Sequence, residues 1–482
     1  MMVVPLPILI LKQILENIYY QDQHEFQKFG KKEEFIWTLQ YALVSKQWFA
    51  ISKQLNNINT CLPIDVLEKS YTTNYNSEFR LMAKESIHQL AIRFIDMDKY
   101  IEIVNCQYRS VLSITILHND FTSGWIDNSL WYLNHLNKLE RKDHIVVNFD
   151  FSLMADSLWN ACLGQAETRV PLKFKANHFK VTYDCDGDEG KTYGYIYQVI
   201  KDVSPKTLEF ISGASSDGGA GHLKIFHSLS KLDHQYQSIE IKHDYLPLYS
   251  LYRFLQSPTL HIFKFNLQFH FLSALYDDNE NDGDFIYNLC SMDNFEYRDF
   301  EFDTHYEFQR ETCRAMNVNE DNQVYCTFDR YGDSNPTIPS YSKQLWKQCL
   351  QLVANNKTIT EFSIGETQCG EECFGNNESM NQQLIDDLLE SLSNNQSIKT
   401  LYLNTNTLIN KEFILALVQR NSTLHSIYLG SPYVDHNQCS ALLDDLSQSM
   451  PSNSKCVLKN VNLGNDDVED FLLIIFRETV QK

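Results

Sequence analysis

Apolar and polar positions follow two alternating periods along the segment from residue 384 to residue 429. Leu388 and Leu392 recur at the spacing of a helix, and Leu401 and Leu403 then follow at the spacing of a strand. The same succession returns later in this segment and is also found just before it. In all three copies, six residues separate the last helical apolar position from the first one of the strand: Val353 and Ile359, Leu392 and Ile398, Val418 and Leu424. Such constant phasing predicts one helix-and-strand unit that is used repeatedly.

Neither element of this unit can bury its apolar side alone. The helix buries one stripe and the strand buries alternate residues, so neighbouring copies must stack to share a core. An asparagine stands between helix and strand at Asn356, Asn395 and Asn421, and we expect it to end the helix in the left-handed conformation that Asn tolerates. The run "IKTLYLNTN" (residues 398–406) resembles a leucine-rich repeat. The resemblance implies an α/β solenoid with a parallel sheet.

The strand half of the pattern returns along most of the chain after residue 61. Its apolar triplets begin at Ile87, Val111, Tyr236, Leu260 and Tyr297 and, after the three clear copies, at Leu458. The repeats are clearest over residues 341–482. The phasing is lost over residues 145–230, where "HIVVNFDF" and "FKVTY" alternate like strands between loops rich in Gly and Asp. We therefore predict a separate module over residues 1–60 and an irregular repeat domain over residues 61–482.

The pattern of residues 1–60 predicts helices rather than repeats. Pro7 suits the first turn of a helix, and apolar residues follow it at helical spacing. A second apolar segment, around "LVSKQW", comes after a polar insertion over residues 21–34. A small helical cap on the end of the repeats would account for this pattern.

The same segment also resembles an F-box, the helical module that docks substrate receptors onto the adaptor of cullin–RING ubiquitin ligases. The residues that carry the resemblance, and that would bind the adaptor, are Leu6, Pro7, Ile10, Leu11, Ile14, Leu15, Leu43, Val44, Lys46 and Trp48. Ser45 replaces the usual Cys, Ile8 and Leu9 stand where acidic residues are common, and the insertion is longer by roughly fifteen residues. The resemblance implies an all-α F-box-like module and an adaptor of the S-phase kinase-associated protein type as partner.

Charge and composition narrow the possible partners. The 482 residues include 41 basic and 62 acidic ones, and the net charge of −21 disfavours nucleic acid and anionic membranes. No uninterrupted apolar run approaches roughly 18 residues, so we expect no membrane span. The apolar start has no basic residue before it and contains two prolines, unlike a signal peptide. The scattered single cysteines are typical of a reduced cytoplasmic or nuclear protein.

No motif predicts an active site, a metal site or a cofactor. Two acidic loops approach the EF-hand spacing, but the final carboxylate position holds Tyr195 in one and Leu289 in the other, so solvated turns explain them better. Cys369 and Cys373 form a close pair without a second pair at zinc-ligand spacing, and we interpret them as free thiols. The glycine-rich "SGASSDGGAGH" lacks the Lys-Ser/Thr of a phosphate-binding loop.

The residues between the buried alternates of a repeat strand must face outward. The predicted partner-binding residues are Thr400, Tyr402, Ser426, Tyr428 and Asn462. Stacked copies would place Tyr402 beside Tyr428, and tyrosine is enriched at interface hot spots. The alternative is that the two rings only cover the sheet and bind nothing. Upstream, residues 299–303 would add an acidic outward row suited to a basic segment of the same partner.

Together the two parts predict a non-catalytic substrate-recognition subunit of a cullin–RING ubiquitin ligase. The F-box-like helices would hold the adaptor, and the repeats would hold a protein substrate. The alternative is a leucine-rich-repeat interaction scaffold without ligase association, in which the first helices only cap the array. An enzyme would need a site within the unassigned residues 145–230.

Overall fold

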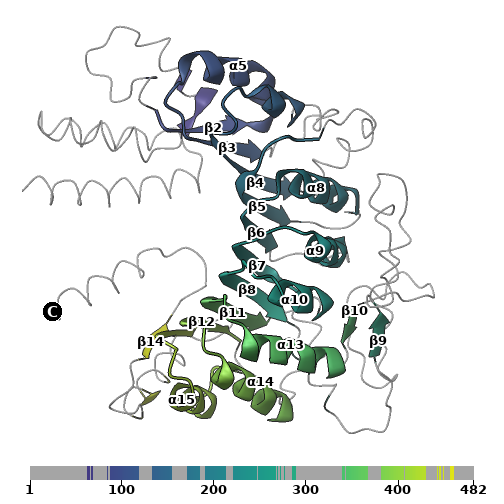
Figure 1. Cartoon of the computed structure of the whole chain (residues 1–482), viewed down its shortest axis with the longest axis vertical. Coiled ribbons are helices and arrows are strands. Elements are labelled where there is room, and N and C mark those ends of the chain that lie inside the picture. The colour runs from purple at the N-terminus through teal and green to yellow at the C-terminus, as the bar shows by residue number, and fades with distance from the viewer. Residues whose placement is uncertain are drawn as a thin grey trace, which may run out of the picture. The chain divides into compact units, whose positions relative to one another are not determined.

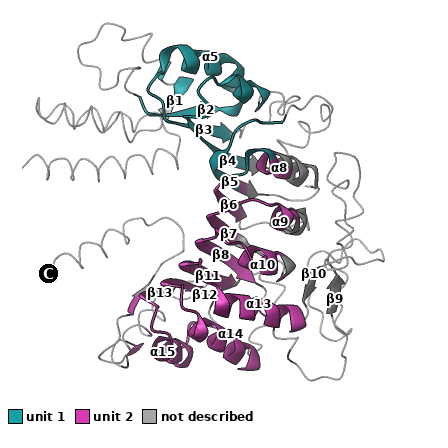
Figure 2. Ribbon diagram, in the orientation of Figure 1, with its two compact units in different colours: residues 1–181, 202–205 teal, residues 182–201, 206–482 magenta. Residues whose placement is uncertain are grey.

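The chain divides into two compact units, shown in Figure 2. One comprises residues 1–181 and 202–205, and the other comprises residues 182–201 and 206–482. The computed structural model describes residues 62–65, 67–68, 84, 87–118, 133–154, 171–184, 190–212, 221–246, 248–267, 269, 272, 276, 285–288, 339–341, 343–366, 382–405, 408–429, 442, 445–446, 449 and 456–460. The predicted module at residues 1–60 lies outside these residues.

The first unit is built on parallel strands that are paired in chain order. The strands are β1 (Leu62–Pro63), β2 (Gln89–Arg93), β3 (Ser113–His118), β4 (Val146–Met154) and β5 (Ala176–Asp184), of which residues 176–181 belong to this unit. Its helices are η2 (Phe94–Asp96), α5 (Met97–Gln107) and η3 (Asn134–Lys138). Phe149, Phe151 and Phe179 are completely buried, with ring centroids 5.1 to 5.6 Å apart. This aromatic cluster forms part of the core on the buried side of β4 and β5.

The second unit alternates helices with parallel strands. Its strands, in the order of the sheet, are β6 (Thr207–Ser212), β7 (Ser238–Tyr245), β8 (Ile262–Leu267), β11 (Glu361–Glu366), β12 (Thr400–Asn404), β13 (Ser426–Leu429) and β14 (Val457–Asn460). Its helices are α8 (Gly190–Val203), of which residues 190–201 belong to this unit, α9 (Gly221–Lys231), α10 (Leu248–Leu255), α13 (Lys343–Asn355), α14 (Gln382–Asn394) and α15 (Lys411–Arg420). In Figure 1 these helices lie on one side of the sheet, where the apolar alternates of the strands are buried.

The predicted α/β class with a parallel sheet is confirmed. β12 pairs with β13 in parallel, so that Leu401 lies opposite Ile427 and Leu403 opposite Leu429. A separate pair, β9 (Phe285–Asn288) with β10 (Pro339–Tyr341), is antiparallel. The parallel register of β12 and β13 shows that units with the fixed helix-to-strand spacing stack in register.

Two predictions about the order and register of the strands are wrong. β8 pairs directly with β11, which leaves no place in the sheet between them for the predicted strand that begins at Tyr297; that run lies outside the described residues. On β14, Leu458 lies opposite Ile427, whereas the sequence pattern had matched Leu458 with Leu424. The chain reaches the last strand three residues earlier than the repeat spacing implies.

The segment with lost phasing, residues 145–230, continues the same architecture. The two strand-like runs form β4 and β5 as predicted, but α8, β6 and α9 were not anticipated. β6 has the usual phasing, because buried Val199 precedes buried Pro205 by six residues and Leu208 and Phe210 follow at strand spacing. Proline in place of Ile or Leu concealed the pattern.

The asparagines between helix and strand do not adopt the left-handed backbone conformation that we predicted. Asn421 has an extended backbone (φ −103°, ψ 111°), and among the described residues other than glycine only Ser204 has a positive φ. Instead, each side-chain oxygen accepts hydrogen bonds from the backbone N–H groups two and three residues later, at 2.7 to 3.2 Å. Each side-chain nitrogen donates to a carbonyl of the preceding unit: Asn356 to Leu255, Asn395 to Val353, and Asn421 to Leu392. The three amides thus join consecutive units.

Candidate protein-interaction face

The structure describes four of the predicted site residues. Thr400 and Tyr402 lie on β12, and Ser426 and Tyr428 lie on β13. Asn462 and all ten predicted adaptor-binding residues lie outside the described residues. The residue that is paired with Tyr428 on β14 is Lys459, because of the shifted register.

The four described residues form part of an outward face on the second unit. Leu401 and Leu403 are completely buried, so the side chains that alternate with them on β12 point to the other side of the sheet. Thr400 is paired with Ser426, and Tyr402 with Tyr428. We call the outward side of β6, β7, β8, β11, β12 and β13 the strand face.

Tyr402 and Tyr428 form a stacked pair on β12 and β13, at one end of the strand face. Their ring centroids are 4.6 Å apart and their planes differ by 15°. The pKa of the Tyr402 hydroxyl is raised, chiefly by burial and further by the adjacent Glu361 carboxylate and Tyr428. The hydroxyl shares a hydrogen bond with the Glu361 side chain. The sequence predicted that these rings would be neighbours, and the register confirms it.

Lys264 reaches Tyr402 across an intervening strand. The two residues lie on β8 and β12, with Ser363 of β11 in register between them. Ser363 is small and only 2% exposed, so the lysine side chain can pass over it. The Lys264 ammonium lies 4.6 Å from the Tyr402 ring centroid and 2.7 Å from Glu361 Oε1. This cation–π contact was not anticipated from the sequence.

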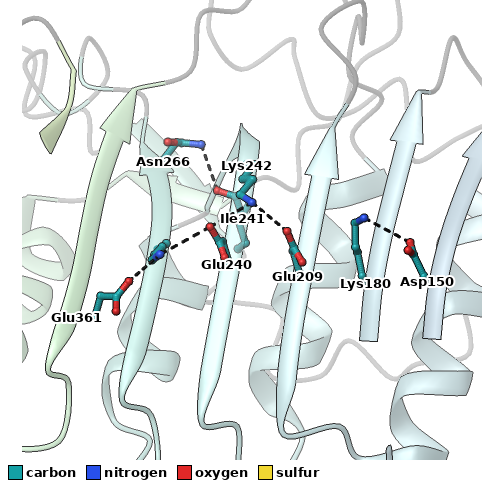
Figure 3. A network of polar contacts seen from close by, with 9 residues as sticks. Asp150, Lys180, Glu209, Glu240, Ile241, Lys242, Asn266 and Glu361 are labelled. Atoms are coloured by element: carbon teal, nitrogen blue, oxygen red, sulfur yellow. Dashed lines mark hydrogen bonds and ion pairs between the residues drawn. The ribbon is translucent and has the colours of Figure 1, made fainter. Parts of the chain in front are cut away.

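Charged side chains continue the strand face towards β6, as Figure 3 shows. Lys242 Nζ lies 2.9 Å from Glu209 Oε1 and 3.3 Å from Glu240 Oε1, and Glu240 in turn lies 3.9 Å from Lys264 Nζ. Partial burial works against the charged form of Lys242, but the Glu240 and Glu209 carboxylates prevail and raise its pKa. Carboxylates and ammonium groups thus alternate across four strands. The alternation of apolar and charged residues in "TLEFIS", "SIEIK" and "IFKFN" carried this signal in the sequence.

The first unit has polar outward side chains of its own. Lys180 Nζ on β5 lies 3.5 Å from Asp150 Oδ1 on β4, as Figure 3 shows. Asn148 donates to the Ser113 hydroxyl at 3.1 Å. These contacts join neighbouring strands, and each exposed ion pair of this kind contributes roughly 0.2–1 kcal/mol.

Gly365 lies on the strand face between two asparagines, and its missing side chain leaves room for Asn266. It is paired with Asn266 of β8 and Asn404 of β12. A Cβ atom at this position would lie 2.1 Å from Asn266 Oδ1 and 3.1 Å from Asn404 Cβ. Asn266 also donates to the Ile241 carbonyl at 3.3 Å, which holds its side chain over the glycine. Only glycine accommodates this arrangement without a shift of its neighbours.

We expect Gly365→Ala to lower the free energy of unfolding by about 1–2 kcal/mol, because Asn266 must leave its hydrogen bond. Chemical denaturation of the full chain measures this change. In an Asn266→Ala background the same substitution should have a smaller effect, since the obstructing oxygen is gone. Strictly additive effects of the two substitutions would mean that Asn266 does not constrain this position.

The described residues contain no group of three or more His, Cys, Asp or Glu side chains that could hold a metal ion. Cys369, Cys373 and most of the two acidic loops lie outside the described part of the chain. Within the described residues, every helix is too short or too polar to cross a lipid bilayer.

No protein-family model matches the chain, and no curated protein matches its sequence.

Proposed function

We propose that this protein is a non-catalytic substrate-recognition subunit of a cullin–RING ubiquitin ligase, acting in the cytoplasm or nucleus. The repeating units would form a leucine-rich-repeat-like solenoid whose strand face receives a protein substrate. Support for the solenoid comes from the constant spacing of helix and strand and from the asparagines that join consecutive units. The ligase association is supported by the F-box resemblance of residues 1–60.

The stacked tyrosine pair is the observation that carries the recognition role. Tyr402 and Tyr428 stand on the side of the sheet opposite the helices, and small polar residues, Thr400 and Ser426, lie beside them. Tyrosines in such a setting offer a large, rigid contact area to a partner. Since the pair is anchored by two adjacent strands, it would not need to reorganise on binding.

The proposed adaptor contact can be tested with the purified adaptor and the full chain. Pro7→Ala combined with Trp48→Ala should weaken adaptor binding by about 100-fold, because two apolar anchors are lost at roughly tenfold each. Isothermal titration calorimetry measures the affinity, and hydrogen exchange over residues 343–429 checks that the repeats remain folded.

Tyr402→Ala combined with Tyr428→Ala is the matched control, and it should leave adaptor binding unchanged. Undiminished binding by the Pro7 and Trp48 variant would contradict the F-box assignment. An adaptor that does not bind even the unaltered chain would make an interaction scaffold the correct description.

A further inference from the structure

The strand face already binds one cationic group, the ammonium group of Lys264, and the surroundings of this group indicate which ligands the face attracts. The Lys264 ammonium lies 2.7 Å from Glu361 Oε1, 3.9 Å from Glu240 Oε1 and 4.6 Å from the centroid of the Tyr402 ring. Two carboxylates and an aromatic face thus surround a single positive charge. The Lys264 side chain is only 23% exposed, so these attractions act in a partly desolvated place where they are strong.

The row of charged side chains on the strand face has one more carboxylate than ammonium groups, and Lys459, which is in register with Tyr428, lies beyond this face on β14. In the order of their contacts, the alternating row consists of Glu209, Lys242, Glu240, Lys264 and Glu361. It begins and ends with a carboxylate, so among the outward side chains described on β6 to β13 there are three carboxylates and two ammonium groups. The Glu361 end adjoins the tyrosine pair. The whole chain, at −21, adds a long-range field of the same sign.

Tyr428 extends the aromatic surface beyond the place that Lys264 occupies. It stacks on Tyr402 at 4.6 Å, one strand further from Lys264. A planar guanidinium group can stack on such rings and also bond a carboxylate through two N–H groups. An acidic segment would be repelled by the carboxylates, and an apolar one would have to desolvate them without compensation. The chemistry therefore favours arginine over the alternatives.

We propose that the substrate segment received by the strand face carries an arginine whose guanidinium group lies on the Tyr402–Tyr428 pair beside Glu361. This inference rests on the recognition role proposed above and specifies the class of partner, a basic peptide segment. Lys264 then competes with the bound arginine for Glu361 and the Tyr402 ring, so it lowers the affinity of the face.

The test uses the full chain and the fluorescein-labelled peptide GSGRGSRGSG. Its control is the same peptide with citrulline in place of arginine, which keeps the shape and removes the charge. Fluorescence anisotropy at low salt should give at least about tenfold tighter binding of the arginine peptide. The preference should shrink at high salt, because part of it is electrostatic.

Three variants locate the binding. Glu361→Gln and Tyr428→Leu should each reduce the preference for arginine severalfold, whereas Lys264→Met should increase it, because the aliphatic stem stays and the competing ammonium is removed. Glu390→Gln, at an exposed position of α14, changes the net charge equally and should have no effect. Equal binding of the two peptides, no binding of either, or a loss of affinity in Lys264→Met would overturn the proposal.

A peptide-display selection on the full chain separates this inference from the proposed function. If the selected peptides lack arginine but lose binding on Tyr402→Leu, the strand face is the binding surface and the proposal of a basic partner is wrong. Selected peptides that are insensitive to Tyr402→Leu would refute the strand face itself. Adaptor binding is measured independently of both outcomes.

Discussion

Replacing Asn395 with alanine should lower the stability of the second unit by about 3 kcal/mol. Asn395 is 1% exposed, and its side-chain oxygen accepts from the Ser397 and Ile398 N–H groups at 2.8 and 2.7 Å. Its side-chain nitrogen donates to the Val353 carbonyl at 2.6 Å. Alanine removes the hydrogen-bonding partner of these three backbone groups, and each buried group that loses its hydrogen bond costs about 1–3 kcal/mol.

Hydrogen exchange of the amides in residues 343–429 measures this effect on the local opening free energy. A loss of about 3 kcal/mol corresponds to roughly 100-fold faster exchange. Asn394→Ala is the matched control, because Asn394 is exposed and immediately precedes Asn395. Equal effects of the two substitutions would show that the amides do not join the units.

The second large effect is expected at Leu401. Leu401→Asn should reduce stability by about 4 kcal/mol, since it gives up the burial of a completely buried leucine and places an amide in the apolar core. The same substitution one residue earlier, Thr400→Asn, should cost less than about 1 kcal/mol, because Thr400 lies on the strand face.

The pair of variants tests the alternation of β12 directly, because the two residues are adjacent in sequence. Chemical denaturation gives the overall stability of each variant, and hydrogen exchange over residues 343–429 reports on this region. A Thr400 variant as unstable as the Leu401 variant would mean that both sides of β12 are buried, and the strand face could not receive a partner.

The sequence predicted those parts of the fold that depend on local spacing. The six-residue distance between helix and strand anticipated β11, β12 and β13 and the pairing of Tyr402 with Tyr428. It could not show that β8 pairs with β11, because a long segment separates the two strands in sequence and only packing brings them together. It also failed at β6, where Pro205 occupies the position of an aliphatic residue.

The same distinction applies to the candidate site. The outward position of Tyr402 follows from alternation along a single strand, and it was predicted. The contact of Lys264 with Tyr402 depends on the pairing of β8 with β11 and on the small size of Ser363, and no local pattern shows either. The asparagines were recognised as the ends of helices, but their hydrogen bonds to the preceding unit depend on how the copies stack.

The central claim is that one protein holds the ligase adaptor at its start and a substrate on its strand face. Quantitative proteomics of cells that carry each altered full-length chain tests it most directly. Pro7→Ala with Trp48→Ala removes the first contact, and Tyr402→Ala with Tyr428→Ala removes the second. A substrate receptor predicts that the same proteins accumulate, with less ubiquitin attached, in both cases. Different proteins accumulating in the two cases, or no change with the tyrosine variant, would contradict the account.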